Sequence, residues 1–201
     1  MTIWENATEW ERQWWGNCNN TFMEESKQII FAKCLGLEFE RTDKTFYEIN
    51  MEEKSVLDIG GGPISLLLKC VNVDGTVADP CKYPDWVYER YKGAGIKVDN
   101  RKGEDLIFED KVFDEVWMYN VLQHVEDPEK LVKNARACCK MIRFADYPFT
   151  AARPEYGHPN CLQPEKMDEW LGGEGKVEAV NDRELNTQIY HGIFKGEWYG
   201  K

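Results

Sequence analysis

Three consecutive glycines, at positions 60, 61 and 62, constrain the fold of this chain more than any other feature. An apolar run at residues 55–59 precedes them and predicts a buried strand, and an apolar run to about Cys70 follows them and predicts a helix. Glycine lets the backbone turn tightly and leaves no Cβ between the chain and a ligand. A helix that begins at such a turn offers unpaired N–H groups to that ligand. The stretch therefore predicts a nucleotide-binding turn.

Residues on either side of the glycines distinguish two kinds of nucleotide site. The pattern Gly-x-Gly-x-x-Ser at residues 60–65 is a loose dinucleotide fingerprint. However, Asp58 stands where dinucleotide-binding strands usually carry an apolar residue, and Pro63 and Ile64 follow where a pyrophosphate needs open backbone. An acidic residue at a strand tip suits a ligand with a positive group instead. The stretch resembles motif I of the class I S-adenosylmethionine-dependent methyltransferases, an acidic residue followed by Gly-x-Gly; Ile64 occupies the place of a third glycine in many members.

This resemblance implies a Rossmann-like α/β fold with a doubly wound sheet of seven strands, mostly parallel, with an antiparallel C-terminal strand. It implies S-adenosylmethionine as cofactor and S-adenosylhomocysteine as product. Five strand–helix alternations followed by two strands, at residues 176–180 and 187–194, fit that sheet. The cofactor-binding residues expected at the turn are Asp58, Gly60, Gly61 and Gly62.

Acidic residues at the next two strand tips are further candidates for cofactor binding. Asp79 and Pro80 end a predicted strand, and Asp79 lies where a carboxylate can accept hydrogen bonds from both ribose hydroxyls. The alternative for Asp79 is a turn aspartate before proline. Trp86 either covers the adenine or belongs to the core. In the resembled family an acidic residue after the third strand binds the adenine amino group together with a neighbouring backbone N–H; the candidates are Glu104, Asp105 and Leu106.

A second, more specific match follows the fourth predicted strand, at residues 113–119. Phe-Asp-x-Val in this strand and Leu-x-His-Val-x-Asp-Pro at residues 122–128 resemble the small-molecule branch of the same family. By this resemblance Asn120 and Val121 lie at the cofactor, where a backbone carbonyl contacts the methionyl ammonium. His124 is the first candidate for a general base, and a histidine that packs or caps a helix start is the alternative.

The first 50 residues lie outside the resemblance and predict an N-terminal helical cap, with residues 51–201 as the methyltransferase domain. Four tryptophans, among them Trp14 and Trp15, fall in or beside a predicted helix at residues 4–15. These helices either pack on the sheet or form a lid over the ligand. We expect Trp14 and Trp15, with Tyr147 and His158 from the loop at residues 146–162, to contact the substrate. His158 is the second candidate base.

Composition limits the partners. The net charge of −11 argues against a nucleic acid or membrane surface as the main partner. Seven cysteines without a Cys-x-x-Cys pair, and no apparent secretory signal, favour a reduced, cytoplasmic protein. With three histidines and no ligand spacing, no metal is expected.

The sequence therefore predicts an enzyme that transfers a methyl group from S-adenosylmethionine to a small-molecule acceptor, at oxygen or nitrogen rather than carbon. One alternative is a non-catalytic S-adenosylmethionine-binding sensor or subunit. A nicotinamide-dependent reductase is less favoured, because such an enzyme would need a separate substrate domain and the sequence shows no sign of a second domain. A nucleic-acid amino-methyltransferase is disfavoured because Asn120 is not followed by Pro-Pro-Tyr.

Overall fold

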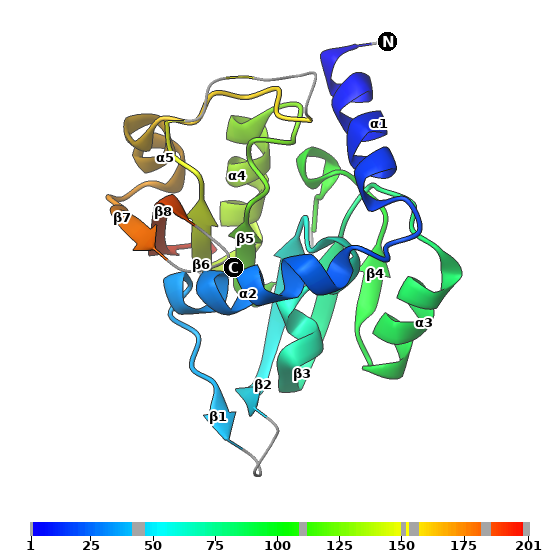
Figure 1. Cartoon of the computed structure of the whole chain (residues 1–201). Coiled ribbons are helices and arrows are strands. Elements are labelled where there is room, and N and C mark those ends of the chain that lie inside the picture. The colour runs from blue at the N-terminus through cyan, green and yellow to red at the C-terminus, as the bar shows by residue number, and fades with distance from the viewer. Residues whose placement is uncertain are drawn as a thin grey trace.

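In the computed structural model a single twisted sheet is covered by helices on both faces (Figure 1). The structure describes residues 2–41, 47–108, 112–149, 152, 157–181 and 186–198. Its strands are β1 (Glu40–Arg41), β2 (Tyr47–Ile59), β3 (Cys70–Ala78), β4 (Lys97–Asp99), β5 (Phe113–Tyr119), β6 (Cys139–Asp146), β7 (Lys176–Asn181) and β8 (Asn186–Lys195). Its α-helices are α1 (Ile3–Trp15), α2 (Thr21–Cys34), α3 (Asp85–Gly93), α4 (Pro128–Ala137) and α5 (Pro164–Leu171).

The strand order is β4-β3-β2-β5-β6-β8-β7, and β1 pairs with the start of β2. Strands β2 to β6 are parallel, whereas β8 runs antiparallel to both β6 and β7. The predicted mostly parallel, Rossmann-like sheet with antiparallel C-terminal strands is confirmed. Chain order reverses between β2 and β5, and ligands of such sheets bind beyond the carboxyl ends of the strands at that switch point.

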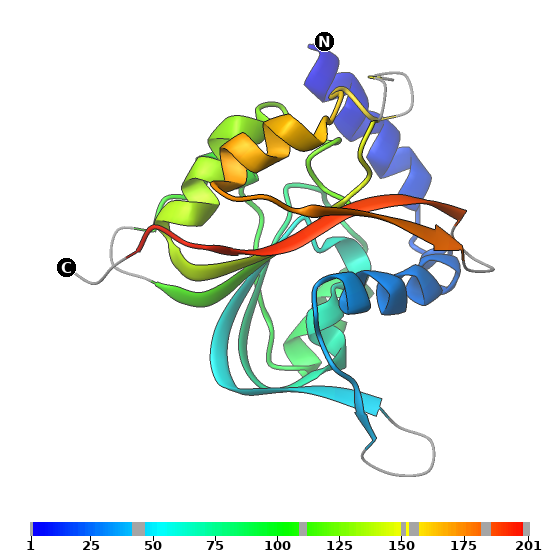
Figure 2. The ribbon, with the colours of Figure 1, turned by 90° about the vertical axis from the view of Figure 1, so that its left-hand side faces the viewer.

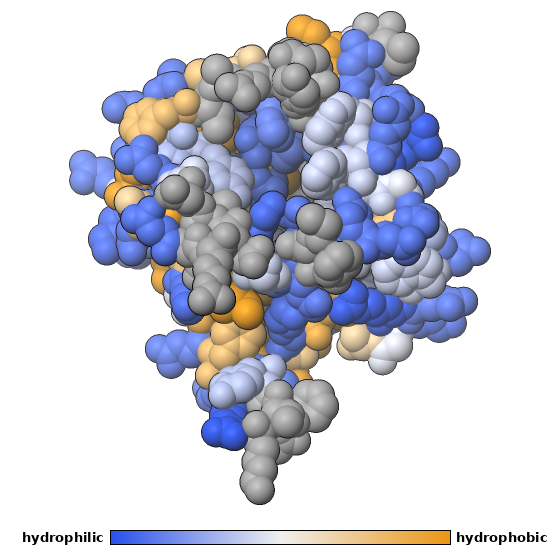
Figure 3. All heavy atoms as spheres, in the orientation of Figure 1, coloured by the Kyte–Doolittle hydropathy of each residue, from blue (hydrophilic) through white to orange (hydrophobic). Residues whose placement is uncertain are grey.

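Two apolar clusters fill the two faces of the sheet. Alternate residues of β5 divide between them, with Val116 and Met118 packed under α4 and α5, and Trp117 and Tyr119 packed under α2 and α3. Burial on both faces explains why residues 116–119 of β5 form a continuous apolar run. Figure 2 shows α4 and α5 on one side of the sheet and α2 on the other. The face in Figure 3 is largely hydrophilic, in keeping with the acidic composition.

The prediction of a helix after the glycines is wrong. Two short 3₁₀ segments, η1 (Gly62–Ile64) and η2 (Leu66–Lys69), replace it, and β3 already begins at Cys70. The crossover from β2 to β3 therefore has only residues 60–69, fewer than the dozen or so that a parallel crossover with an α-helix needs. Ser65, with φ −44° and ψ 144°, separates the two segments.

Side chains satisfy the backbone donors that the missing helix leaves unpaired. The Ser65 N–H donates to the Tyr91 hydroxyl and the Leu66 N–H to the Tyr119 hydroxyl, each at 2.9 Å. Tyr119 in turn donates to the carboxylate of Asp58 at 2.9 Å, and the Ser65 hydroxyl donates to the same oxygen. The carboxylate of Asp58 is thus buried beneath the turn and stabilises its shape.

The N-terminal helices are confirmed, with Thr2 and Glu5 forming a capping box at the start of α1. All residues of α1 are described, and Ala7 alone among them is buried. Because β2 begins at Tyr47, the predicted boundary at residues 50/51 falls inside this strand, and the division into a cap and a domain stays a prediction. The loop expected at residues 146–162 lies partly outside the described residues.

A buried ion pair attaches α2 to the sheet. Glu115 of β5 is fully buried and accepts hydrogen bonds from Arg143 of β6 at 2.7 and 3.2 Å. Lys54 and the indole N–H of Trp117 also contact this carboxylate, at 3.2 and 2.8 Å. Arg143 donates a further hydrogen bond to the carbonyl of Leu35, at the C-terminal end of α2, at 2.8 Å. Glu115 thus orients the guanidinium of Arg143, which in turn binds the C-terminal end of α2.

We expect Glu115→Ala to lower the free energy of unfolding by roughly 3–5 kcal/mol, since the arginine is left without its buried partner. Arg143 is only 13% exposed, so water compensates it poorly. Urea unfolding measures the change. Glu169→Ala, which breaks the exposed Lys166–Glu169 pair, is the control and should have little effect. A loss below about 1 kcal/mol for Glu115→Ala would contradict the anchoring role.

Asp58 should make the stability of the fold depend on pH. Burial raises its pKa to about 7, well above the value near 4 of an aspartate in an unfolded chain. The folded state therefore binds this proton more tightly, and the resulting stability, present below about pH 4, is lost as pH rises through about 7. Urea unfolding of Asp58→Asn should show a smaller loss of stability between pH 5 and pH 8, by about 1 kcal/mol or more. Asp105→Asn, an exposed control, should follow the wild type; curves for Asp58→Asn that also parallel the wild type would refute the assignment.

Candidate functional site

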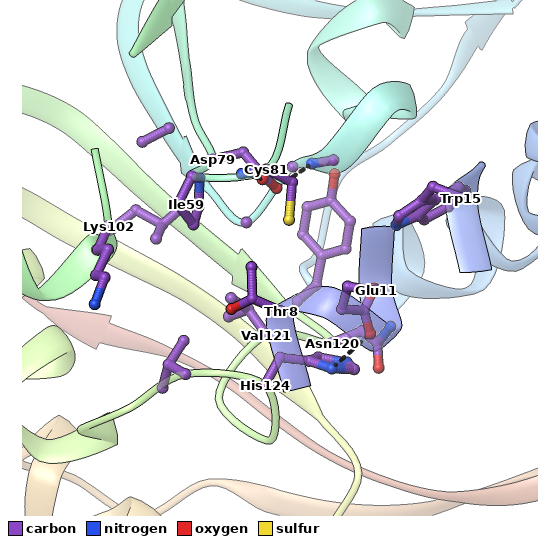
Figure 4. Close-up of a pocket in the computed structure, with 18 of the residues that line it drawn as sticks. Thr8, Glu11, Trp15, Ile59, Asp79, Cys81, Lys102, Asn120, Val121 and His124 are labelled. Carbon is purple, nitrogen blue, oxygen red and sulfur yellow. Dashed lines mark hydrogen bonds and ion pairs between the residues drawn. The ribbon is translucent and has the colours of Figure 1, made fainter. Parts of the chain in front are cut away.

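A cavity opens at the carboxyl ends of β2, β3 and β5, under helices α1 and α2 (Figure 4). It encloses about 1040 Å³, including the part open to solvent. Nine of the residues predicted from the sequence line it: Gly60, Gly61, Gly62, Asp79, Pro80, Glu104, Asn120, Val121 and His124. Trp15 lines it as well. The cavity thus lies at the switch point of the sheet, where the topology predicts a ligand site.

The three glycines line the cavity wall, and a side chain is disfavoured at each of them for a different reason. A Cβ on Gly60 would lie 2.3 Å from Cγ2 of Val121, and one on Gly61 would lie 2.7 Å from the Asp58 carboxylate. Gly62 has a φ of +61°, which favours glycine, and a Cβ added there would have its nearest neighbours 3.9 Å away. Packing therefore excludes side chains at the first two positions, whereas at Gly62 the backbone conformation, rather than a clash, favours glycine.

Asp79 lies at the tip of β3, beside the glycine turn. Its carboxylate accepts hydrogen bonds from the N–H groups of Gly62 at 3.1 Å and Cys81 at 2.9 Å. Burial raises the pKa of this carboxyl group. Asp58, in contrast, does not line the cavity, because its side chain points under the turn toward Ser65 and Tyr119. Of Asp58 and Asp79, only Asp79 lines the cavity.

The candidates for adenine binding divide in the same way. Glu104 lines the cavity, and its Oε1 accepts the N–H groups of Glu126 at 2.8 Å and Asp127 at 3.1 Å. Asp105 points away, 3.7 Å from Lys130, and Leu106 belongs to the core. Trp86 is 40% exposed on α3 and does not line the cavity. The structure therefore favours Glu104 among these residues.

The segment after β5 is held in a tight turn. Asn120 has a φ of +55°, uncommon for a residue other than glycine. Its side chain accepts from Gln123 at 2.6 Å, and the N–H groups of Val121 and Leu122 both donate to Asp146, at 3.1 and 2.8 Å. Burial raises the pKa of Asp146 to about 6. Sequence reasoning missed this aspartate, although it ends the strand next to β5.

His124 follows this turn and faces α1. Its Nδ1 lies 3.0 Å from Oε1 of Glu11 and 2.9 Å from the carbonyl oxygen of Gly157. The ring of His158 packs edge-on against that of His124, with centroids 4.8 Å apart. His158 does not line the cavity. Of the two candidate bases, the structure brings only His124 to the cavity wall.

Two other predicted substrate contacts lie elsewhere. Trp14 is 49% exposed and stacks on Trp10, with centroids 5.6 Å apart. Tyr147 packs edge-on against Phe31 in the core beneath α2. Neither side chain lines the cavity.

The cap contributes residues that sequence reasoning overlooked. Trp4, Thr8 and Glu11 line the cavity from α1 beside the predicted Trp15, and Glu24, Lys27, Gln28 and Phe31 line it from α2. Each set recurs at intervals of three or four residues, which places its members on one face of a helix. That periodicity is visible in the sequence and could have identified both sets.

Neither a metal cluster nor a membrane span is found within the part of the chain that the structure describes. No three histidine, cysteine, aspartate or glutamate side chains there gather in a way that could hold a metal ion. None of the described helices has the length and apolar character that crossing a membrane requires.

Comparisons with known proteins agree with this geometry. Residues 57–141 match the family model of a methyltransferase domain. No curated protein matches the chain significantly. Among solved structures, a chain from the complex between the Haloferax volcanii Trm112 methyltransferase activator and its candidate methyltransferase is 12% identical, with a TM-score of 0.62 over 92% of this chain and 96% of that one.

Two similar structures contain S-adenosylhomocysteine. DhpI in complex with it is 14% identical, with a TM-score of 0.60 over 98% of both chains. The N-terminal domain of EvdMO1 with it bound is 13% identical, with a TM-score of 0.56 over 86% of this chain and 80% of that one. At identities this low, the structural similarity establishes a common fold and nothing finer. Together with the family match they confirm the predicted resemblance: this chain has the fold of the class I S-adenosylmethionine-dependent methyltransferases, and its residues 57–141 match the model of a methyltransferase domain.

Proposed function

We propose that this protein binds S-adenosylmethionine in the cavity and transfers its methyl group to a small-molecule acceptor, at oxygen or nitrogen. The observation that carries the proposal is the convergence of Gly62, Asp79, Glu104 and Asn120, from four separate segments, on one cavity at the switch point of the sheet. These are the positions at which the resembled family holds its cofactor.

The residues at the cavity fit the cofactor chemically. Asp79 would accept hydrogen bonds from the ribose hydroxyls, because a carboxylate has about four acceptor sites and its two backbone donors occupy part of them. The bare backbone of Gly62 leaves room beside it for the methionine part. Glu104 would bind the adenine side, and the backbone near Asn120 and Val121 the ammonium group.

The charge of the lining residues supports a cationic ligand. Four carboxylates line the cavity, those of Glu11, Glu24, Asp79 and Glu104, against two lysines, Lys27 and Lys102. One of these lysines already pairs with Glu24 at 2.7 Å. S-adenosylmethionine carries a positive sulfonium and a positive ammonium, so an acidic wall stabilises it.

Helices α1 and α2 would provide the acceptor side. Their lining residues combine aromatic rings with Thr8 and Gln28, a mixture typical of small-molecule pockets. Because α1 buries so little of its own surface, we propose that it acts as a lid, as one interpretation of the sequence suggested.

The bound cofactor supplies a methyl group activated by a positive sulfur. The protein has to hold the acceptor atom about 3 Å from that carbon, in line with the bond that breaks, and to exclude water. A hydroxyl or amine acceptor must also lose a proton. His124, at the cavity wall, is the residue we propose for this task, and His158 packs behind it.

Isothermal titration with S-adenosylmethionine and S-adenosylhomocysteine tests cofactor binding. We expect micromolar affinity in the wild type and a roughly ten- to hundredfold loss in Asp79→Asn, because the hydrogen bonds from ribose to a charged acceptor are weakened. Asp105→Asn, at the neighbouring acidic position outside the cavity, should bind like the wild type. If neither ligand binds the folded wild type, the proposal is wrong. Binding without methyl transfer to any of a wide panel of acceptors would instead favour a sensor or subunit.

Hydrogen exchange tests the lid. Amides of α1 should exchange faster than those of α4. Helix α4 packs its apolar face against the sheet, whereas α1 is held mainly by side-chain contacts at its surface. Saturation with S-adenosylhomocysteine should slow exchange in α1 and leave α4 unchanged. Equal protection of α1 and α4 without ligand would show that α1 is a fixed part of the fold.

A further inference from the structure

The environment of His124 determines which of its ring nitrogens carries the proton. Nδ1 lies 2.9 Å from the carbonyl oxygen of Gly157 and 3.0 Å from Oε1 of Glu11. A carbonyl oxygen accepts hydrogen bonds and cannot donate one, and an ionised carboxylate likewise only accepts. Nδ1 must therefore carry the hydrogen. In the neutral imidazole this leaves the lone pair on Nε2, the nitrogen able to accept a proton.

The carboxylate that contacts His124 belongs to the cap. Glu11 lies on α1, and its side chain is 17% exposed while that of His124 is 20% exposed, so the pair is largely removed from water. In Figure 4 a dashed line joins the two residues. Gly157 allows the close approach, because a Cβ there would lie 2.8 Å from the Trp10 ring and 3.2 Å from the Glu11 carboxylate.

We propose that Glu11 is a positioning residue: it holds His124 in the tautomer that leaves the lone pair on Nε2, so that His124 accepts the proton of the methyl acceptor. This role deepens the proposed function and rests on it. Because Glu11 is on α1, the carboxylate–histidine pair forms only when the helix covers the cavity. Closure of the lid and assembly of the base are then one event.

Atoms and electrons balance in this transfer. The lone pair of the acceptor oxygen or nitrogen forms the bond to the methyl carbon, and the electron pair of the broken carbon–sulfur bond remains on sulfur. The proton of the acceptor passes to Nε2 of His124, which becomes an imidazolium. Glu11 stabilises that charge at Nδ1, on the opposite side of the ring. His124 later returns the proton to water.

Other groups face His124, and their effects have to be separated from that of Glu11. Burial, the largest single effect, lowers the pKa of His124, but the hydrogen bond and charge of Glu11, together with Asp146 and the Gly157 carbonyl, raise this pKa above its ordinary value. The carboxylate of Asp146 is already occupied by the N–H groups of Val121 and Leu122. His158 packs edge-on against the ring and brings no negative charge to it. Glu11 is thus the acidic group in direct contact with the imidazole.

Nuclear magnetic resonance of the full ¹⁵N-labelled chain tests the pair directly. Long-range ¹H–¹⁵N spectra give the tautomer and the pKa of His124, assigned with a His124→Gln variant. We expect the neutral wild-type ring to carry its hydrogen on Nδ1, with a pKa above the usual 6.5. Glu11→Gln should lower this pKa by about one unit or more, since an opposite charge in contact shifts a pKa by 1–3 units. Glu9→Gln, on the exposed side of the same helix, should not change it.

A second titration decides whether Nε2 faces the transferred group. Sinefungin carries an amine-bearing carbon in place of the methylated sulfur, whereas S-adenosylhomocysteine is uncharged at that atom. With sinefungin bound, the pKa of His124 in the wild type should lie at least about half a unit lower than with S-adenosylhomocysteine, because the added positive charge lies near the ring. A histidine that serves only to pack α1 would show no such difference.

Each outcome bears on a different part of the proposal. A neutral ring protonated on Nε2, or a pKa unchanged in folded Glu11→Gln, would overturn the positioning role of Glu11. Equal pKa values with the two ligands, both bound, would overturn the proton-accepting role while leaving cofactor binding intact. Failure of S-adenosylhomocysteine to bind the wild type would refute the proposed function and with it this role. Should Glu11→Gln not fold, the wild-type tautomer and the two-ligand comparison still decide the question.

Discussion

The short crossover between β2 and β3 is the constraint on which the rest of this molecule depends. With only residues 60–69 available, the chain cannot place an α-helix after its glycine turn. The donors that such a helix would satisfy are taken by the hydroxyls of Tyr91 and Tyr119. Asp58 and Ser65 complete this network beneath the turn. The shape of the cavity wall is thus set by side-chain hydroxyls rather than by helix geometry.

That network explains why acidic residues at neighbouring strand tips have different roles. Asp58, Asp79 and Asp146 are all buried at the carboxyl ends of strands, and each accepts hydrogen bonds from groups in the loops that follow. Burial raises the pKa of all three. Only Asp79 also lines the cavity, so it combines a structural role with access to a ligand. The other two hold the loops in which the site residues lie.

The cavity has two sides of different origin. The segments that follow the parallel strands form one side, and α1 and α2 form the other. Helix α2 packs its apolar face on the sheet, and Arg143 binds its C-terminal end. Helix α1 buries only Ala7 and contacts the other side through Lys102, stacked over the ring of Trp4 at 3.3 Å, and through the Glu11–His124 pair. A helix held mainly in this way can move without unfolding the sheet, which is the property that a lid requires.

By itself, the sequence determined the elements and most of the strand-tip positions. The bounds of β5 and the positions of the two C-terminal strands follow from local periodicity, which depends on neighbouring residues alone. Nine predicted cavity residues are found in the cavity wall because residues just after parallel strands meet at one edge of the sheet.

Only the tertiary structure decided which way individual side chains point. Local pattern could not show that Asp58 turns under the glycines, that Asp105 and Trp86 face outward, or that the apolar run at residues 63–70 is too short a crossover for a helix. Nor could it pair Glu11 with His124, which are far apart in the chain and meet only when α1 packs over the sheet. Orientation and long-range pairing depend on the packing of whole elements, and no local stretch of sequence contains that information.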